Sequence, residues 1–179
     1  SFVIKNYLGA DQVGIYGLAY KIYSNLVLPA YYLNSTIFPV LSKNNNKSDR
    51  SFKTAVGLTI AGLIFLVPLT IGFSNTAVNL IAGQQFPTSG RILKILAAGL
   101  IFAYFNHLTG FLLIAKNKQV DSLKIAVLGL SWNLALNLIL VPRFGITAAA
   151  WITVSTEALV TIISALILWP SAVRLQTSL

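Results

Sequence analysis

The stretch TAVGLTIAGLIFLVPLTIGF, residues 54–73, contains twenty consecutive residues without a charged side chain. An α-helix rises about 1.5 Å per residue, so roughly twenty residues cross the hydrocarbon core of a bilayer. A transmembrane strand instead alternates between lipid-facing and interior-facing side chains over about ten residues. Residues 61–69, AGLIFLVPL, are apolar on every side. Because a helix satisfies its own backbone hydrogen bonds in lipid, we predict that residues 54–73 form a transmembrane helix.

The chain on both sides of this stretch contains further apolar runs of similar length. Three of them carry no charge, and the last, residues 144–173, is interrupted only by Glu157. We therefore predict an all-α, multi-pass transmembrane helix bundle with about five spans, preceded at residues 1–8 by the outer end of another helix. The predicted spans are residues 13–41, 54–73, 95–115, 124–141 and 146–169.

The composition of the whole chain is typical of a membrane protein. Of its 179 residues, 56% are hydrophobic and 9% are charged, whereas a soluble domain has about 45–50% apolar and about 25% charged residues. The chain has no Cys and one His, so a cysteine metal site is excluded and a His-rich one is disfavoured. The G-x-S-x-G, P-loop and H-E-x-x-H signatures are also missing. We predict no enzyme activity, no metal and no cofactor.

The net charge of +9 comes from cations that lie mainly in short connections between apolar runs. This distribution argues against nucleic-acid binding, which needs a solvated basic face. If the spans alternate in direction, eight cations fall on one side of the membrane and four on the other. The positive-inside rule then places the loop at residues 43–53 in the cytoplasm. The eight cytoplasmic cations are Lys43, Lys47, Arg50, Lys53, Lys116, Lys118, Lys124 and Arg174.

Glu157 lies near the middle of the last predicted span, roughly 16 Å from its outer end at helical rise. A central acid costs about 2.5–3.5 kcal/mol on an insertion scale, so this side chain is expected to face protein or water. Thr153, Glu157, Thr161 and Ser164 share one helix face. Two interpretations remain open: a seam of small residues between helices, or a cavity wall that binds substrate or a coupling ion.

Other polar residues within the spans also have both a structural and a functional interpretation. Lys21 and Asn25 are four residues apart, beside three tyrosines that include Tyr20. They form either an interfacial belt with a snorkelling lysine, or a cation for a phosphate group beside aromatic faces for sugar rings. His107 is either a satisfied buried histidine or a relay, and Asn133 and Asn137 either bond neighbouring helices or line a cavity. The candidate cavity residues are Tyr20, Lys21, Asn25, His107, Asn133, Asn137 and Glu157, with Glu157 also the candidate coupling group.

Two longer stretches carry a family resemblance. Residues 9–43, GADQVGIYGLAYKIYSNLVLPAYYLNSTIFPVLSK, contain an outer turn that leads into a helix ending in FPVLSK. Residues 133–157, NLALNLILVPRFGITAAAWITVSTE, carry the P-x-x-G turn at Pro142 and Gly145. Both resemble the polysaccharide-transporter branch of the multidrug/oligosaccharidyl-lipid/polysaccharide (MOP) exporter superfamily, which includes the O-antigen flippases. The intervening sequence fits in the same order.

The resemblance implies a carrier with two six-helix lobes that moves lipid-linked sugars outward by alternating access. Residues 1–179 would be most of the second, C-terminal lobe of a longer protein. The implied partners are the lipid bilayer, a polyprenyl-pyrophosphate-linked sugar substrate and the missing N-terminal lobe, in a bacterial cytoplasmic membrane. Two alternatives remain: a multidrug or cation antiporter of the same superfamily, and a membrane scaffold subunit that transports nothing.

Overall fold

The computed structural model describes residues 2–42 and 46–176, and these ranges are almost entirely helical. They contain no strand, which confirms the predicted all-α helix bundle. The elements in chain order are α1 (Phe2–Leu8), α2 (Ala10–Leu41), α3 (Asn46–Ala82), a 3₁₀ turn (Gly83–Gln85), α4 (Pro87–Ala115) and α5 (Gln119–Gln176).

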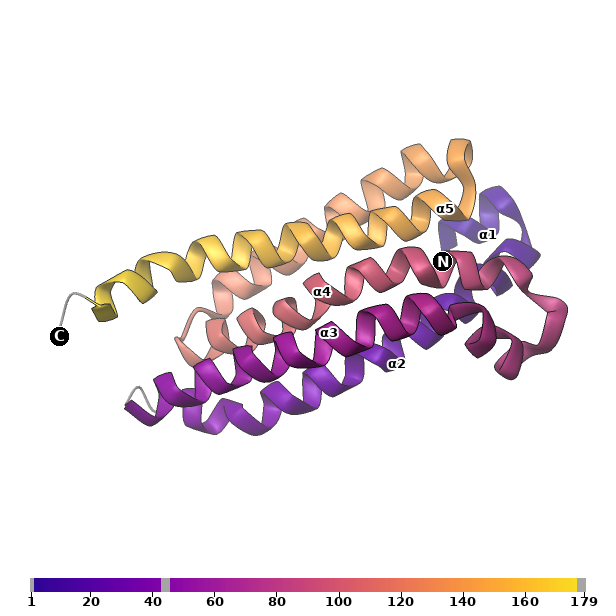
Figure 1. Cartoon of the computed structure of the whole chain (residues 1–179). Coiled ribbons are helices and arrows are strands. Elements are labelled where there is room, and N and C mark those ends of the chain that lie inside the picture. The colour runs from indigo at the N-terminus through magenta and orange to yellow at the C-terminus, as the bar shows by residue number, and fades with distance from the viewer. Residues whose placement is uncertain (1, 43–45, 177–179) are drawn as a thin grey trace.

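The last element, α5, consists of two helical arms joined at Gly145 (Figure 1). Gly145 has φ 68° and ψ −158°, a backbone conformation that is essentially restricted to glycine. The chain reverses there, and residues 146–176 run back alongside residues 119–144. The predicted spans 124–141 and 146–169 therefore lie in separate arms of one hairpin.

Three helices of the described residues are long and apolar enough to cross a membrane. They are α3 from Arg50 to Ala82, α4 over its whole length, and α5 from Gln119 to Leu168. The predicted span 13–41 lies in α2, which is not among the three. Tyrosine, serine and asparagine side chains interrupt the apolar residues of α2.

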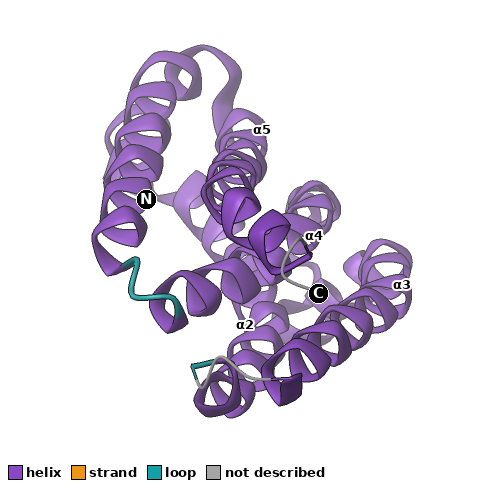
Figure 2. Cartoon of the chain, turned by 90° about the vertical axis from the view of Figure 1, so that its left-hand side faces the viewer, coloured by secondary structure: helices purple, strands orange, loops and turns teal. Residues whose placement is uncertain are grey.

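The centre of the bundle is α4, which packs against α2, α3 and α5. Viewed end-on, α4 lies between α5 on one side and α2 and α3 on the other (Figure 2). Its buried side chains, Ile92, Leu93, Leu96 and Leu100, form the middle of the core. In contrast, α2 and α5 scarcely touch each other, and the short α1 packs against both. This arrangement leaves a cleft between α2 and α5, with α4 as its floor.

The connections alternate between the two ends of the bundle. The end of α2 and the turn between α4 and α5 lie at one end, whereas the 3₁₀ turn and the reversal within α5 lie at the other (Figure 1). Lys118 lies in the α4–α5 turn, and its ammonium group donates to the backbone oxygen of Ile167 at 2.9 Å. Part of the predicted cytoplasmic set lies outside the described residues: the structure does not describe Lys43, or the side chains of Lys47 and Arg174.

Candidate functional site

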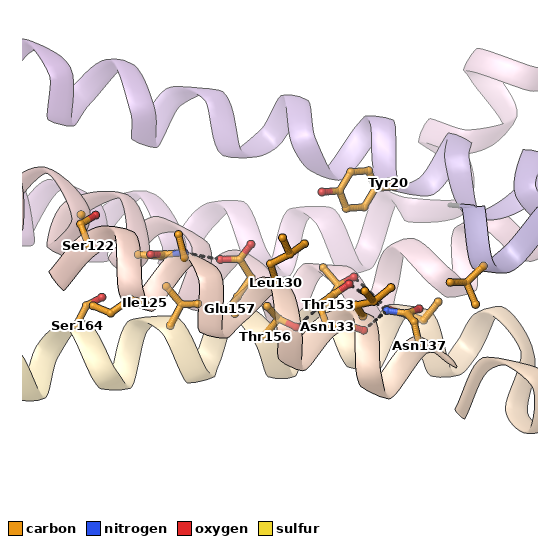
Figure 3. A pocket seen from close by; sticks show the side chains of 18 of the residues that line it. Tyr20, Ser122, Ile125, Leu130, Asn133, Asn137, Thr153, Thr156, Glu157 and Ser164 are labelled. Carbon is orange, nitrogen blue, oxygen red and sulfur yellow. Dashed lines mark hydrogen bonds between the residues drawn. The ribbon is translucent and has the colours of Figure 1, made fainter. Parts of the chain in front are cut away.

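The cleft between α2 and α5 contains a cavity of about 860 Å³ that reaches both arms of α5. Its walls come from α1, α2, α4 and α5, and Val3 and Ile4 of α1 lie against one end of it. Much of the lining is polar, although the surrounding helices are apolar. The polar residues that line it are Tyr16, Tyr20, Asn106, Ser122, Asn133, Asn137, Thr153, Thr156, Glu157 and Ser164 (Figure 3).

A second cavity of about 420 Å³ lies against α2 and α4. Tyr20 and Glu157 line both cavities, so these two residues mark the place where the cavities meet. The remaining lining of the second cavity is largely aromatic and aliphatic. It comprises Tyr23, Ser24, Val27, Leu28, Tyr31 and His107.

Glu157 is held at this junction by a hydrogen bond from the neighbouring helix. The side-chain nitrogen of Asn106 on α4 donates to Oε2 of Glu157 at 2.9 Å. Glu157 is half-buried and faces protein and the cavities, as its insertion cost requires. The partner Asn106 is not among the sequence candidates, although it is the residue next to His107.

The polar stripe around Glu157 is part seam and part cavity wall. Thr161 lines neither cavity, and its hydroxyl donates to the backbone oxygen of Phe102 on α4 at 2.9 Å. Thr153 lines the larger cavity, and its hydroxyl oxygen lies 2.9 Å from the phenolic oxygen of Tyr16 on α2. Each of the two interpretations therefore describes some members of the stripe.

Asn133 and Asn137 form a small network on the first arm of α5. The side-chain nitrogen of Asn137 donates to the backbone and side-chain oxygens of Asn133, at 2.8 and 3.0 Å. Asn133 in turn donates to the hydroxyl oxygen of Thr156 on the second arm at 3.0 Å. Both asparagines also line the larger cavity. They bond one arm to the other and present amide groups to the cavity at the same time.

The structure does not bring Lys21 and Asn25 into either cavity. Both are exposed, and the side chain of Asn25 donates to the backbone oxygen of Lys21 in its own helix. His107 does line the second cavity, edge-on to the ring of Tyr31 with the ring centroids 6.1 Å apart. Among the described residues that line the two cavities, Glu157 carries a formal charge and none is Lys or Arg.

Tyr31 belongs to the site but is not among the sequence candidates. It follows Tyr20 by eleven residues, close to three full helical turns, so the two tyrosines share a face of α2. That spacing is a signal that could have found it. Tyr23 lies on the same side, and its buried hydroxyl has no hydrogen-bond partner among the described residues.

Comparison with known proteins gives three curated relatives. The chain is 27% identical over 168 residues to a probable low-salt glycan biosynthesis flippase, Agl15, of Haloferax volcanii, covering 91% of the chain and 36% of that protein. It is 27% identical over 148 residues to an uncharacterized membrane protein of Methanocaldococcus jannaschii, covering 74% of the chain and 29% of that protein. It is 26% identical over 123 residues to the teichuronic acid biosynthesis protein TuaB of Bacillus subtilis, covering 65% of the chain and 25% of that protein.

No family model and no solved structure matches the chain. The named relatives confirm the resemblance to polysaccharide transporters that the sequence predicts. The chain spans about a third or less of the length of the relatives it matches. They come from two archaea and one bacterium, so they support a membrane location without favouring a bacterial source.

Proposed function

We propose that this chain, a relative of polysaccharide flippases, is part of a carrier that moves a lipid-linked oligosaccharide or polysaccharide precursor across the cytoplasmic membrane by alternating access. The observation that carries the proposal is the polar cleft between α2 and α5, which lies in a bundle with an apolar exterior. The names of two relatives support it, since one is a probable glycan flippase and the other a teichuronic acid biosynthesis protein.

The outer surface and the cleft suit the two parts of such a substrate. Apolar side chains such as Phe65, which is 77% exposed, and Leu80 cover the outside of α3. A polyprenyl chain would remain in lipid beside surfaces of this kind, because transfer of its apolar groups into a polar cleft is unfavourable. The hydrated head would cross through the cleft, where amide and hydroxyl groups replace its water. No bond is made or broken in this process.

The rest of the carrier would come from sequence beyond this chain, because the relatives are about three times longer or more. We propose that an N-terminal lobe supplies the opposite wall of the cleft and that the loop at residues 43–53 faces the cytoplasm. Glu157 is the proposed coupling group, because it carries the formal charge at the junction of the two cavities. Asn133, Asn137, Tyr20 and His107 are proposed substrate contacts, whereas Lys21 and Asn25 lie outside the cavities.

A cation antiporter is the second candidate, because the charge that lines the cavities is a carboxylate. The full-length protein in vesicles separates the candidates. Inward-to-outward movement of a fluorescent lipid-linked oligosaccharide, absent from protein-free vesicles, is expected for the flippase. Efflux of an organic cation with no movement of the lipid-linked sugar would favour the antiporter. Movement of neither compound would favour a scaffold subunit.

A further inference from the structure

We infer that the two cavities bind the sugar rings of the transported glycan along aromatic side chains, and that its phosphate groups are held elsewhere. This inference rests on the proposed function and specifies which part of the substrate this chain recognises. Three observations carry it: the charge of the cavity lining, the aromatic rings along α2, and the polar groups beside those rings.

The charge of the lining disfavours a phosphate ligand. The described residues around both cavities include a carboxylate, Glu157, and no Lys or Arg. A pyrophosphate placed there would lose hydration and meet a like charge at low dielectric, without a cation to offset either effect. Lys21, the nearest cation by sequence, is exposed and lines neither cavity. A neutral ligand avoids this conflict.

Aromatic side chains form two groups along α2, which together we call the aromatic track. On α2, the ring centroid of Tyr20 lies 5.8 Å from those of Tyr16 and Tyr23. Further along, the Tyr31 centroid lies 5.7 Å from that of Phe111 on α4, which lies 5.8 Å from that of Phe38 on α2. Residues 16 and 38 are about 33 Å apart at helical rise, similar to the thickness of the hydrocarbon core. The aromatic track comprises Tyr16, Tyr20, Tyr23, Tyr31, Phe38 and Phe111.

Four members of the aromatic track line a cavity, and two of these, Tyr20 and Tyr31, are also well exposed. Tyr20 is 43% exposed and Tyr31 is 46% exposed, and both line the second cavity. The faces of pyranose rings carry aliphatic C–H groups that stack on aromatic faces, whereas their edges carry hydroxyl groups. Figure 3 shows Tyr20 on α2 across the cleft from Glu157 and Leu130 on α5. A sugar that passes from one cavity to the other therefore has a ring face on one side and a carboxylate on the other.

Polar side chains lie beside the rings, where the hydroxyl groups of a sugar would be. Asn133 and Asn137 line the larger cavity, and Ser24 and His107 line the second. These groups accept and donate hydrogen bonds without a net charge when the histidine is neutral. An aromatic and aliphatic wall with a few placed polar groups, as in the second cavity, is the usual composition of a small-molecule site. The volumes of both cavities fall within the usual range of about 300–1,000 Å³ for such sites.

The test is direct binding of free glycans and free phosphate to the full-length protein in detergent. The probes are a panel of neutral oligosaccharides built from hexoses and N-acetylhexosamines, and inorganic pyrophosphate as competitor. We expect at least one oligosaccharide to bind and pyrophosphate not to compete. Tyr20→Ala and Tyr31→Ala are expected to raise Kd at least fivefold, because each removes a stacking face. Tyr31→Phe keeps the ring and is expected to bind within about twofold of the unchanged protein.

Tyr7→Ala is the matched control, because Tyr7 on α1 is 56% exposed and lines neither cavity. Tyr32 is unsuitable, because its ring centroid lies 5.7 Å from that of Tyr31. Equal effects of Tyr31→Ala and Tyr7→Ala, competition by pyrophosphate, or no binding of any oligosaccharide would each overturn the inference. The binding assay does not require transport. Glycan binding without vesicle flux would therefore contradict the proposed function alone, whereas flux that survives loss of the tyrosine rings would contradict the inference alone.

Discussion

The phenolic oxygen of Tyr16 and the hydroxyl oxygen of Thr153 lie 2.9 Å apart and join α2 to the second arm of α5. These helices make few other contacts across the cleft. The pair therefore bridges the cleft at the wall of the larger cavity.

Tyr16→Phe removes this link and keeps the ring. We expect it to open the cleft more often and to lower the free energy of unfolding by about 0.5–1.5 kcal/mol, the usual net contribution of one hydrogen bond. The measurement is the labelling rate of a cysteine placed at Asn133 in a full-length protein without other cysteines. The rate is expected to rise in Tyr16→Phe and in Thr153→Val, but not in the control Tyr7→Phe. Equal rates in all variants would show that the bond does not hold the cleft closed.

Gly129, on the first arm of α5, packs against side chains of the second arm. A Cβ atom at Gly129 would lie 2.8 Å from Cγ2 of Val160. We expect Gly129→Ala to destabilise the protein by about 1–3 kcal/mol through overpacking. Adding Val160→Ala is expected to restore part of this loss, as measured by thermal unfolding in detergent. Gly62→Ala, whose Cβ would meet nothing within 4 Å, is the control and is expected to be neutral or slightly stabilising.

Gly145 is sensitive for a different reason. A Cβ atom there would also meet nothing within 4 Å, but its φ of 68° with ψ of −158° is strained for any other residue. We expect Gly145→Ala to cost about 1–3 kcal/mol. Because the strain lies in the backbone, shrinking a neighbouring side chain should not rescue it, in contrast to Gly129→Ala. A rescue of that kind would point to crowding as the cause.

Asn106 offers a test of how Glu157 is held. Asn106→Ala removes the donor that bonds Oε2 of Glu157. We expect a loss of about 1–3 kcal/mol in the free energy of unfolding, because a partly buried acceptor is left without its partner. The double variant Asn106→Ala with Glu157→Leu should be less destabilised than the sum of the two single variants. Strict additivity in thermal unfolding would contradict a direct interaction.

Glu157→Gln distinguishes a structural role of Glu157 from its proposed role in ion coupling. The glutamine keeps a carbonyl oxygen to accept from Asn106, so we expect folding to be retained. If Glu157 is the coupling group, flux driven by an ion gradient should fall at least tenfold in Glu157→Gln, whereas exchange without a gradient should continue. Gradient-driven flux equal to that of the unchanged protein would remove Glu157 from the coupling role.

The positions of the helices in the sequence can be predicted from the charged residues and the lengths of the apolar runs. The side-chain contacts between different helices cannot be predicted in this way. The insertion cost of Glu157 predicts that it faces protein, yet nothing local indicates that Asn106 is its partner. That pairing depends on the relative register of α4 and α5, which is set by packing between whole helices. The same limit applies to Tyr16 and Thr153, which are 137 residues apart in the chain.

Lys21 and Tyr20 are adjacent in the sequence but differ in their relation to the cavities. Lys21 follows Tyr20 directly, but consecutive residues on a helix are rotated by about 100°, so the lysine turns away from the cavities that the tyrosine lines. Tyr31 is eleven residues away and returns to the face of Tyr20. A count of helical turns from Tyr20 is therefore a better guide to this site than closeness in the sequence.

The polarity of α2 has a consequence for biogenesis. Among the long helices that the structure describes, α2 is the one that is not apolar enough to qualify as a membrane span by itself, although it contributes side chains to both cavities. During synthesis it would leave the ribosome before α3 and α4, the helices that later cover it. We therefore expect stable entry of α2 into the bilayer to depend on packing against these neighbours, so that the order of insertion need not follow the order of the chain.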